Sequence, residues 1–260
     1  MIIPRKNIYI HAPIFRLLDR LDEFLTLKMN AEIYIISDFV DNPRPECIER
    51  INSAFDKSGL SRKIHGPFMD LNPGSPDKKI KQITLERFTD ALRLCTELKA
   101  DSMVLHSHYE PVFMREHFKK WLDNSMAILE DVSQDAQKRK ISIYIENSLD
   151  DSTKAVGALL KAHPYFGACF DVAHHHAFNP DGWKRALEGY PQGSIKEVHL
   201  SDNNGDEDAH LPLGTGSINF EEFFAEIEKR GEGPVFTIEP HAPEDLVISL
   251  EFMKRFMDGD

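Results

Sequence analysis

The stretch KRKISIYIEN, residues 138–147, decides the fold. From Ile141 to Glu146 apolar residues alternate with other residues, a period of two that is typical of a β-strand. The preceding segment, 116–140, has its apolar residues at spacings of three and four, which indicates an amphipathic helix. A helix with a basic C-terminal end that is followed directly by a short apolar strand is typical of a chain in which helices and strands alternate.

The same unit repeats along the whole chain, with a second clear helical segment at 80–99 and no linker-like stretch. Eight strands alternating with helices predict a single-domain (β/α)8 barrel over residues 1–260. A doubly wound open sheet is the competing arrangement, but the count of eight and the absence of GxGxxG after the first strand favour closure. The runs are NIYIHAP (7–13), AEIYIIS (31–37), RKIHGPF (62–68), SMVLHSH (102–108), ISIYIEN (141–147), GACFDVAH (167–174), KEVHLSD (196–202) and PVFTIEP (234–240).

The composition is that of an ordinary globular protein, with 41% hydrophobic residues and a formal charge of −12 from 31 Lys and Arg against 43 Asp and Glu. No apolar run is long enough to span a membrane, and the opening MIIPRKNIYIHAP has too short an apolar stretch for a secretory signal. Three scattered cysteines, Cys47, Cys95 and Cys169, form no CxxC pair. We therefore predict a cytoplasmic protein without disulfides or thiolate-bound metal.

Histidines and carboxylates gather where the predicted strands end, which is where (β/α)8 barrels carry their active sites. Carboxylates converging on one barrel mouth are costly unless cations neutralise them. Imidazole and carboxylate without thiolate suit zinc or manganese, so we predict a site for such an ion. The candidate residues are His65, His106, His108, Glu146, Asp171, His174, His199, Asp208, His210 and Glu239.

The motifs IHGPF, VLHSH, YIEN, CFDVAH, VHLSDN, DAHLPLGTG and TIEP resemble, in order, those of xylose-isomerase-like TIM barrels, a superfamily of sugar isomerases and epimerases that also includes endonuclease IV. In the endonuclease branch, the resemblance implies that nine of these residues, all except His108, are ligands of a trinuclear metal cluster. Together with the isomerase branch, it sets the expectation at one to three ions per chain. In the isomerase branch, it implies one metal held by Glu146, Asp171, His199 and Glu239. There Glu146 and Glu239 are the natural catalytic pair for proton transfer.

Two enzymatic functions follow. The leading one is a metal-dependent isomerase or epimerase of a sugar or sugar phosphate; the alternative is an endonuclease IV-like hydrolase of phosphodiesters. The five additional ligands favour the alternative. The short loop with Asp206, Glu207 and Asp208 and no Lys or Arg opposes binding to DNA, as does the negative net charge. We expect a small carbohydrate or phosphoester substrate; the oligomeric state stays open.

Other residues near the predicted mouth have weaker assignments. Arg44, Lys78, Lys79 and Arg115 are candidates to hold a phosphate group, and His11 and His241 are candidates to contact substrate. In the run His174, His175 and His176 only the first is expected to face the mouth. Cys169, two residues before Asp171, is expected to lie deeper inside the barrel.

Overall fold

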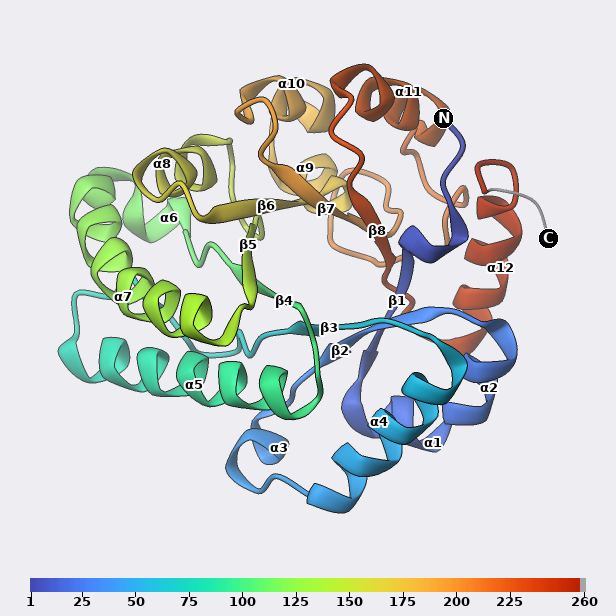
Figure 1. The fold of residues 1–260 in the computed structure, drawn as a ribbon. Coiled ribbons are helices and arrows are strands. Elements are labelled where there is room, and N and C mark those ends of the chain that lie inside the picture. Colours follow the sequence, from blue (N-terminus) through green and yellow to red (C-terminus); the bar gives the residue numbers. More distant parts are fainter. Residues whose placement is uncertain (258–260) are drawn as a thin grey trace.

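Eight parallel strands close into one barrel in the computed structural model, which describes residues 1–257 (Figure 1). Each strand pairs with the next in the chain, and β1 pairs with β8 to close the ring. The predicted closed (β/α)8 barrel is therefore confirmed, whereas the predicted domain end at residue 260 lies outside the described residues. The strands are β1 (Ile8–Pro13), β2 (Asn30–Tyr34), β3 (Arg62–His65), β4 (Ser102–His106), β5 (Ser142–Glu146), β6 (Phe166–Asp171), β7 (Ile195–Leu200) and β8 (Val235–Ile238).

Helices follow the strands and surround the barrel (Figure 1). The largest helix contact is between the two long helices α5 and α7, which cover the β3 to β5 side. The helices are α1 (Ile14–Asp19), α2 (Leu21–Leu27), α3 (Ser37–Asp41), α4 (Pro45–Ser58), α5 (Lys78–Glu97), α6 (Pro111–Met114), α7 (Phe118–Arg139), α8 (Lys154–Ala162), α9 (Val172–Phe178), α10 (Gly182–Gly189), α11 (Phe220–Arg230) and α12 (Pro243–Met253), with 3-10 turns at η1 (Arg5–Asn7) and η2 (Arg115–His117).

Local capping explains where these elements begin. The Asp77 carboxylate accepts hydrogen bonds from the backbone N–H groups of Lys79 and Ile80, so α5 begins two residues before the predicted 80. Asp171 accepts a hydrogen bond from the His174 N–H at 2.7 Å and caps α9. The predicted strand 167–174 was therefore too long, because its last three residues form the first turn of that helix.

The barrel interior is polar just below its mouth. The Lys63 ammonium lies 2.6 Å from the Glu197 carboxylate, although their strands, β3 and β7, are not neighbours in the sheet. This contact must cross the lumen, so both side chains point inward. Since strand side chains alternate, His65 and His199, two residues further on, also point inward at the carboxyl ends of the strands.

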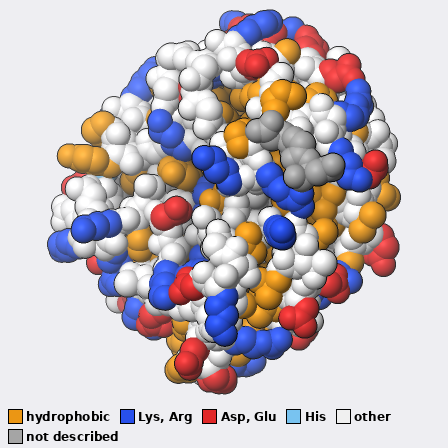
Figure 2. Space-filling view, turned by 45° about the vertical axis from the view of Figure 1, so that its right-hand side comes forward, with side chains coloured by type: hydrophobic (Ala, Val, Ile, Leu, Met, Phe, Trp, Pro, Cys, Tyr) orange, Lys and Arg blue, Asp and Glu red, His pale blue; other side chains and the backbone are white. Residues whose placement is uncertain are grey.

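The outer surface carries charges of both signs, and Lys and Arg side chains are interspersed with Asp and Glu on the face shown in Figure 2. A groove of about 470 Å³ runs between α2 and α12, with Arg20, Leu246 and Lys254 among its lining residues. It shares no residue with the candidate ligands. No helix within residues 1–257 is long and apolar enough to cross a membrane.

Candidate metal centre

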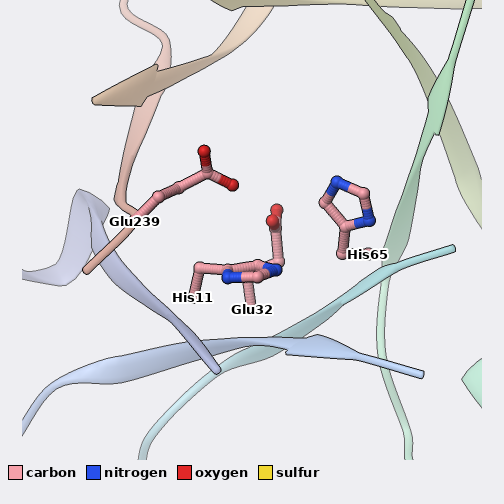
Figure 3. Close-up of side chains that lie close together, drawn as sticks. All are labelled: His11, Glu32, His65 and Glu239. Carbon is pink, nitrogen blue, oxygen red and sulfur yellow. The ribbon is translucent and has the colours of Figure 1, made fainter. Parts of the chain in front are cut away.

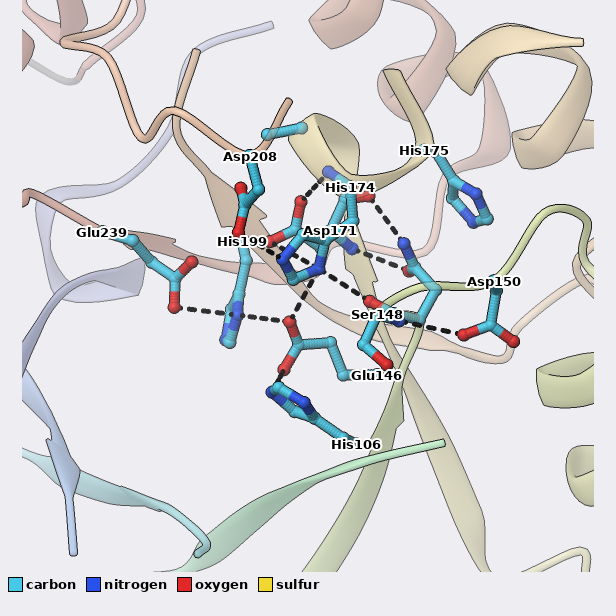
Figure 4. A network of polar contacts seen from close by, with 12 residues as sticks. His106, Glu146, Ser148, Asp150, Asp171, His174, His175, His199, Asp208 and Glu239 are labelled. Carbon is cyan, nitrogen blue, oxygen red and sulfur yellow. Dashed lines mark hydrogen bonds and ion pairs between the residues drawn. The ribbon is translucent and has the colours of Figure 1, made fainter. Parts of the chain in front are cut away.

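The candidate ligands come together at the carboxyl ends of the strands, where the structure brings imidazoles and carboxylates into one cluster (Figure 4). His65, His106, Glu146 and Asp171 are the last residues of β3 to β6, His199 is the penultimate residue of β7, and Glu239 follows β8. His174 comes from the first turn of α9. Asp208 and His210 come from the loop between β7 and α11.

Glu146 lies at the centre of this cluster and is 1% exposed. Its Oε2 atom is 3.3 Å from His65 Nε2 and 3.4 Å from His106 Nε2. Its Oε1 atom is 3.4 Å from Nδ1 of both His174 and His199. One carboxylate therefore contacts four imidazoles that come from four different elements of the fold.

His199 joins this centre to a second carboxylate. Its Nδ1 atom is 3.2 Å from Glu239 Oε1. Asp171 has an oxygen within 4.8 Å of ligand atoms of Glu146 and His174. His199 thus links Glu146 to Glu239, and Glu146 links His199 to Asp171, so the four residues form one chain of neighbouring donors.

A further group of possible ligands lies nearer to solvent. Asp208 Oδ2 is 3.2 Å from His174 Nε2 and 3.2 Å from His210 Nε2. His210 also approaches Glu239, with 3.9 Å between Nδ1 and Oε2. This outer triad of His174, Asp208 and His210 shares His174 with the inner cluster, so the donors suffice for more than one ion.

The loop that carries Asp208 and His210 is anchored at its base by a buried carboxylate. Asp202 Oδ2 accepts hydrogen bonds from the backbone N–H groups of Gly214 and Gly216, and Oδ1 accepts one from Ile218 N–H. A side chain at position 216 would clash, because its Cβ would lie 2.4 Å from Asp202 Oδ1. The glycine therefore permits the close approach that fixes this loop.

The residues fit a divalent metal. Among residues 1–257, the buried atoms Glu146 Oε2, Asp171 Oδ2 and His199 Nδ1 have no hydrogen-bond partner, and neither has Asp208 Oδ1. Buried carboxylate oxygens and imidazole nitrogens without partners are costly unless a cation meets them. Mixed imidazole and carboxylate donors are the set that zinc and manganese accept.

The electrostatics of the cluster also favour a cation. Burial raises the pKa of Asp171 to about 7, and the nearby carboxylates of Glu239 and Glu146 also act to raise it. Burial opposes protonation of His210, yet its hydrogen bond to Asp208 raises its pKa to about 9. The pKa of His199 is likewise raised against burial by the acidic groups around it. The excess of negative charge at the carboxyl ends of the strands therefore favours the binding of a cation there.

A pocket of about 370 Å³ opens beside the cluster and reaches His106, His174 and Asp208. Phe68 forms one wall, where its ring stacks on His106 with centroids 4.5 Å apart. None of the lining residues is Lys or Arg. They are Phe68, Met69, Asp70, Leu71, His106, His108, Glu110, Ser148, Leu149, His174, Phe178 and Asp208.

The four basic residues considered for phosphate binding do not line this pocket. Arg44 pairs with Asp38 at 3.1 Å, and Arg115 pairs with Asp151 at 2.5 Å. Lys78 and Lys79 lie in the exposed first turn of α5.

Four other histidines near the candidate ligands, His11, His175, His176 and His241, divide into two sets. His11 offers a nitrogen within 4.8 Å of ligand atoms of Glu32, His65 and Glu239 (Figure 3), and His241 stacks on His210 at 4.8 Å. Two others bond away from the cluster, His175 to the Tyr190 hydroxyl at 3.2 Å and His176 to Ser217 at 2.8 Å. The buried Cys169 lies deeper on β6, as its position two residues before Asp171 predicts.

Sequence reasoning missed three charged residues inside the barrel, Glu32, Lys63 and Glu197, all buried. Glu32 Oε1 lies 3.2 Å from His199 Nε2. A signal for Lys63 and Glu197 was present, because each lies two residues before a strand-end histidine and therefore shares its face.

The chain is thus a closed (β/α)8 barrel with a cluster of acidic and imidazole donors at the carboxyl ends of its strands. The chain belongs to the family described as xylose isomerase-like TIM barrel, whose model matches residues 30–256.

One curated protein and two solved structures illustrate what the chain is similar to. An uncharacterized protein of Methanocaldococcus jannaschii is 30% identical over 223 residues, covering 82% of this chain and 76% of that protein. The structure of a D-tagatose 3-epimerase-like protein matches with a TM-score of 0.84 at 24% identity, covering 96% of each chain. Endonuclease IV from Thermus thermophilus matches with a TM-score of 0.72 at 20% identity, covering 97% of this chain and 98% of that chain. These structural likenesses establish a shared fold.

Proposed function

We propose that the protein is a divalent-metal-dependent isomerase or epimerase of a small polyhydroxylated carbonyl compound. One observation carries this proposal: Glu146, the last residue of β5, and Glu239, just after β8, both approach His199 Nδ1, at 3.4 and 3.2 Å. Two neighbouring carboxylates that reach one point from different elements suit the transfer of a carbon-bound proton between two faces of a substrate. The similarity to a D-tagatose 3-epimerase-like fold supports the same reaction class.

A bound divalent ion would polarise the adjacent carbonyl and hydroxyl oxygens and so acidify the neighbouring C–H bond. Glu146 would then remove the proton from one face, and Glu239 would return a proton to the opposite face. Asp171 and His199 would complete the inner set of ligands. The wall formed by Phe68 would exclude water from the reacting carbon.

The pocket favours an uncharged substrate within this class. Its ionisable lining residues, besides histidines, are Asp70, Glu110 and Asp208, and carboxylates accept hydrogen bonds from hydroxyl groups. A phosphate dianion would meet these carboxylates without a lysine or arginine to pair with. We therefore propose a free sugar or a similar polyol-carbonyl compound in place of a sugar phosphate.

The test uses protein loaded with Zn²⁺ or Mn²⁺ and panels of free ketoses, aldoses and their phosphates in D₂O. We expect at least one free sugar to be converted with incorporation of solvent deuterium at carbon. Glu146→Gln and Glu239→Gln should each reduce turnover by a factor on the order of 10² or more, as expected for a lost acid or base. Glu130→Gln is the matched control, because Glu130 is an exposed residue of α7 that pairs with His163 at 2.9 Å, outside the cluster. Exclusive turnover of sugar phosphates, or full activity of both variants, would refute the proposal.

A second candidate function is hydrolysis of a phosphodiester by a multinuclear centre. The outer triad supports it, because a single-ion isomerase does not need these donors. Asp206 and Glu207 in the exposed rim oppose a duplex DNA substrate. Robust incision of abasic duplex by metal-loaded protein, lost in Glu239→Gln, would favour this candidate over the isomerase.

A further inference from the structure

The ring of His199 lies between two sets of carboxylates and is fully buried. On one side, its Nδ1 atom faces Glu146 and Glu239. On the other side, its Nε2 atom lies 3.2 Å from Glu32 Oε1 and 3.3 Å from Oε2. Glu32 is on β2, across the barrel from β7, and is 0% exposed (Figure 3 shows its carboxylate pointing into the lumen).

We propose that Glu32 is a positioning residue that holds the His199 ring with its proton on Nε2 and its Nδ1 lone pair directed at the metal centre; this inference rests on the proposed metal binding at His199. An ionised carboxylate only accepts hydrogen bonds, so the imidazole nitrogen that faces it must carry a proton. In the neutral ring, the other nitrogen is then free to bind a cation. Such a carboxylate behind a histidine ligand fixes both the orientation of the ring and its basicity.

Glu197 is the other carboxylate near this ring, but it is already engaged. Its Oε2 atom accepts a hydrogen bond from Lys63 Nζ at 2.6 Å, and its Oε1 atom accepts one from the Thr237 hydroxyl at 2.6 Å. The distance from Glu197 Oε1 to His199 Nε2 is 4.0 Å, too long for a hydrogen bond. Glu32 is therefore the carboxylate that accepts the hydrogen bond from His199 Nε2–H.

Lys63 makes this arrangement possible, because Glu32 and Glu197 lie close together in the lumen. Two buried carboxylates would repel each other, and one would take up a proton, without a nearby positive charge. Lys63 supplies that charge, and its ammonium group also lies 4.7 Å from the centroid of the Tyr9 ring.

The first measurement is the affinity of metal-free protein for Zn²⁺, by competition with a chelator of known affinity. We expect Glu32→Ala to weaken binding by about 10–100-fold, the usual effect of removing a partner behind a metal ligand. Glu32→Gln should have a smaller effect, because the amide oxygen still accepts the hydrogen bond. Glu130→Gln, which alters a histidine–glutamate pair on the outer helices, should bind Zn²⁺ like the wild-type protein.

The second measurement is the His199 Nε2–H signal in protein labelled with ¹⁵N-histidine, assigned by its loss in His199→Gln. We expect a slowly exchanging proton in the wild-type protein, with and without Zn²⁺, because the N–H group is buried and bonded to Glu32. In Glu32→Ala the proton should exchange rapidly. In Glu32→Gln the Nε2–H proton should still exchange slowly, but its chemical shift should change because an amide oxygen replaces the carboxylate. Since this variant is expected to fold correctly, such a change cannot come from misfolding.

The outcomes separate this inference from the proposed function. Wild-type affinity in both Glu32 variants, together with an unchanged Nε2–H signal, would overturn the role of Glu32. If the wild-type protein takes up no divalent metal, the proposed function fails, and the Nε2–H signal in the metal-free protein still decides whether Glu32 holds the ring. If Glu32→Ala does not fold, the Glu32→Gln protein decides both measurements.

Discussion

Asp208 Oδ2 lies 3.2 Å from His174 Nε2, although 34 positions of the sequence separate the two residues. The contact ties the loop after β7 to the first turn of α9, and a whole strand and helix lie between them in the chain. The outer triad is therefore a product of tertiary structure, and its occupancy is open to direct measurement.

Metal binding should stabilise the fold. Buried carboxylate oxygens without a hydrogen-bond partner, such as Glu146 Oε2 and Asp171 Oδ2, favour unfolding until a cation neutralises them. Zn²⁺ at about 1,000 times its dissociation constant should add about 4 kcal/mol to the free energy of unfolding. Thermal unfolding with Zn²⁺ and with excess chelator checks this, with Mg²⁺ as the control ion. Equal melting temperatures in chelator and Zn²⁺ would contradict a structural coupling between the metal and the cluster.

Ligand variants should distinguish one ion from a fuller cluster. With a single ion held by Glu146, Asp171, His199 and Glu239, Glu146→Gln should remove most metal. His65→Ala and His210→Ala should each retain about one equivalent, because these histidines would belong to auxiliary positions. Elemental analysis of the purified variants gives the stoichiometry. Loss of all metal and of phosphodiesterase activity in both histidine variants would instead identify a multinuclear hydrolase.

Asp150 should make the stability fall as the pH rises. Burial raises the pKa of its carboxyl from 3.8 to about 7, although Ser107 Oγ donates a hydrogen bond to it at 2.6 Å. Between about pH 4 and 7 the native state keeps a proton that the unfolded state releases, so the free energy of unfolding decreases across this window. The decrease is on the order of 4 kcal/mol for a pKa difference of about three.

Urea unfolding at about pH 4.5, 6 and 8 measures this decrease, compared between the wild-type protein and Asp150→Asn. The variant should lose this part of the pH dependence and become more stable relative to wild type at the highest pH. Parallel curves for the two proteins would show that the Asp150 carboxyl titrates normally.

Breaking the ion pair in the lumen should be costly. Lys63→Met leaves the Glu197 carboxylate buried without its charged partner, which should lower the free energy of unfolding by about 3–5 kcal/mol. The double variant Lys63→Met with Glu197→Gln removes both charges and should recover most of that loss. Denaturant unfolding of the single and double variants gives the coupling. Equal losses in the two would contradict a paired, fully buried interaction.

The closed barrel and the convergence of the strand ends could both be predicted from the sequence. Alternating strand and helix periods, repeated eight times, leave few topologies, and in a parallel barrel all carboxyl ends meet at one mouth. Glu146, Asp171 and His199 could therefore be grouped without knowing any distance.

The lumen charges could not be grouped in the same way. Lys63 and Glu197 are 134 positions apart, and although each shares the face of a strand-end histidine, no spacing in the sequence pairs one with the other. Only closure of the barrel places them opposite each other. Arg44 and Arg115 were candidates to hold a phosphate group, but they pair with Asp38 and Asp151 instead. These pairings depend on side-chain directions that no spacing in the sequence specifies.

The loop after β7 has a base that is anchored by the carboxylate of Asp202 and a tip that is exposed to solvent. The base is held by bonds to the N–H groups of Gly214, Gly216 and Ile218, and residues 204–207 at the tip make none of these bonds. We therefore expect tips of other lengths and charges to be tolerated between Asn203 and Asp208 while the anchor is preserved. The charge at the rim of this barrel can then be altered without moving the side chains that the strands carry beneath it.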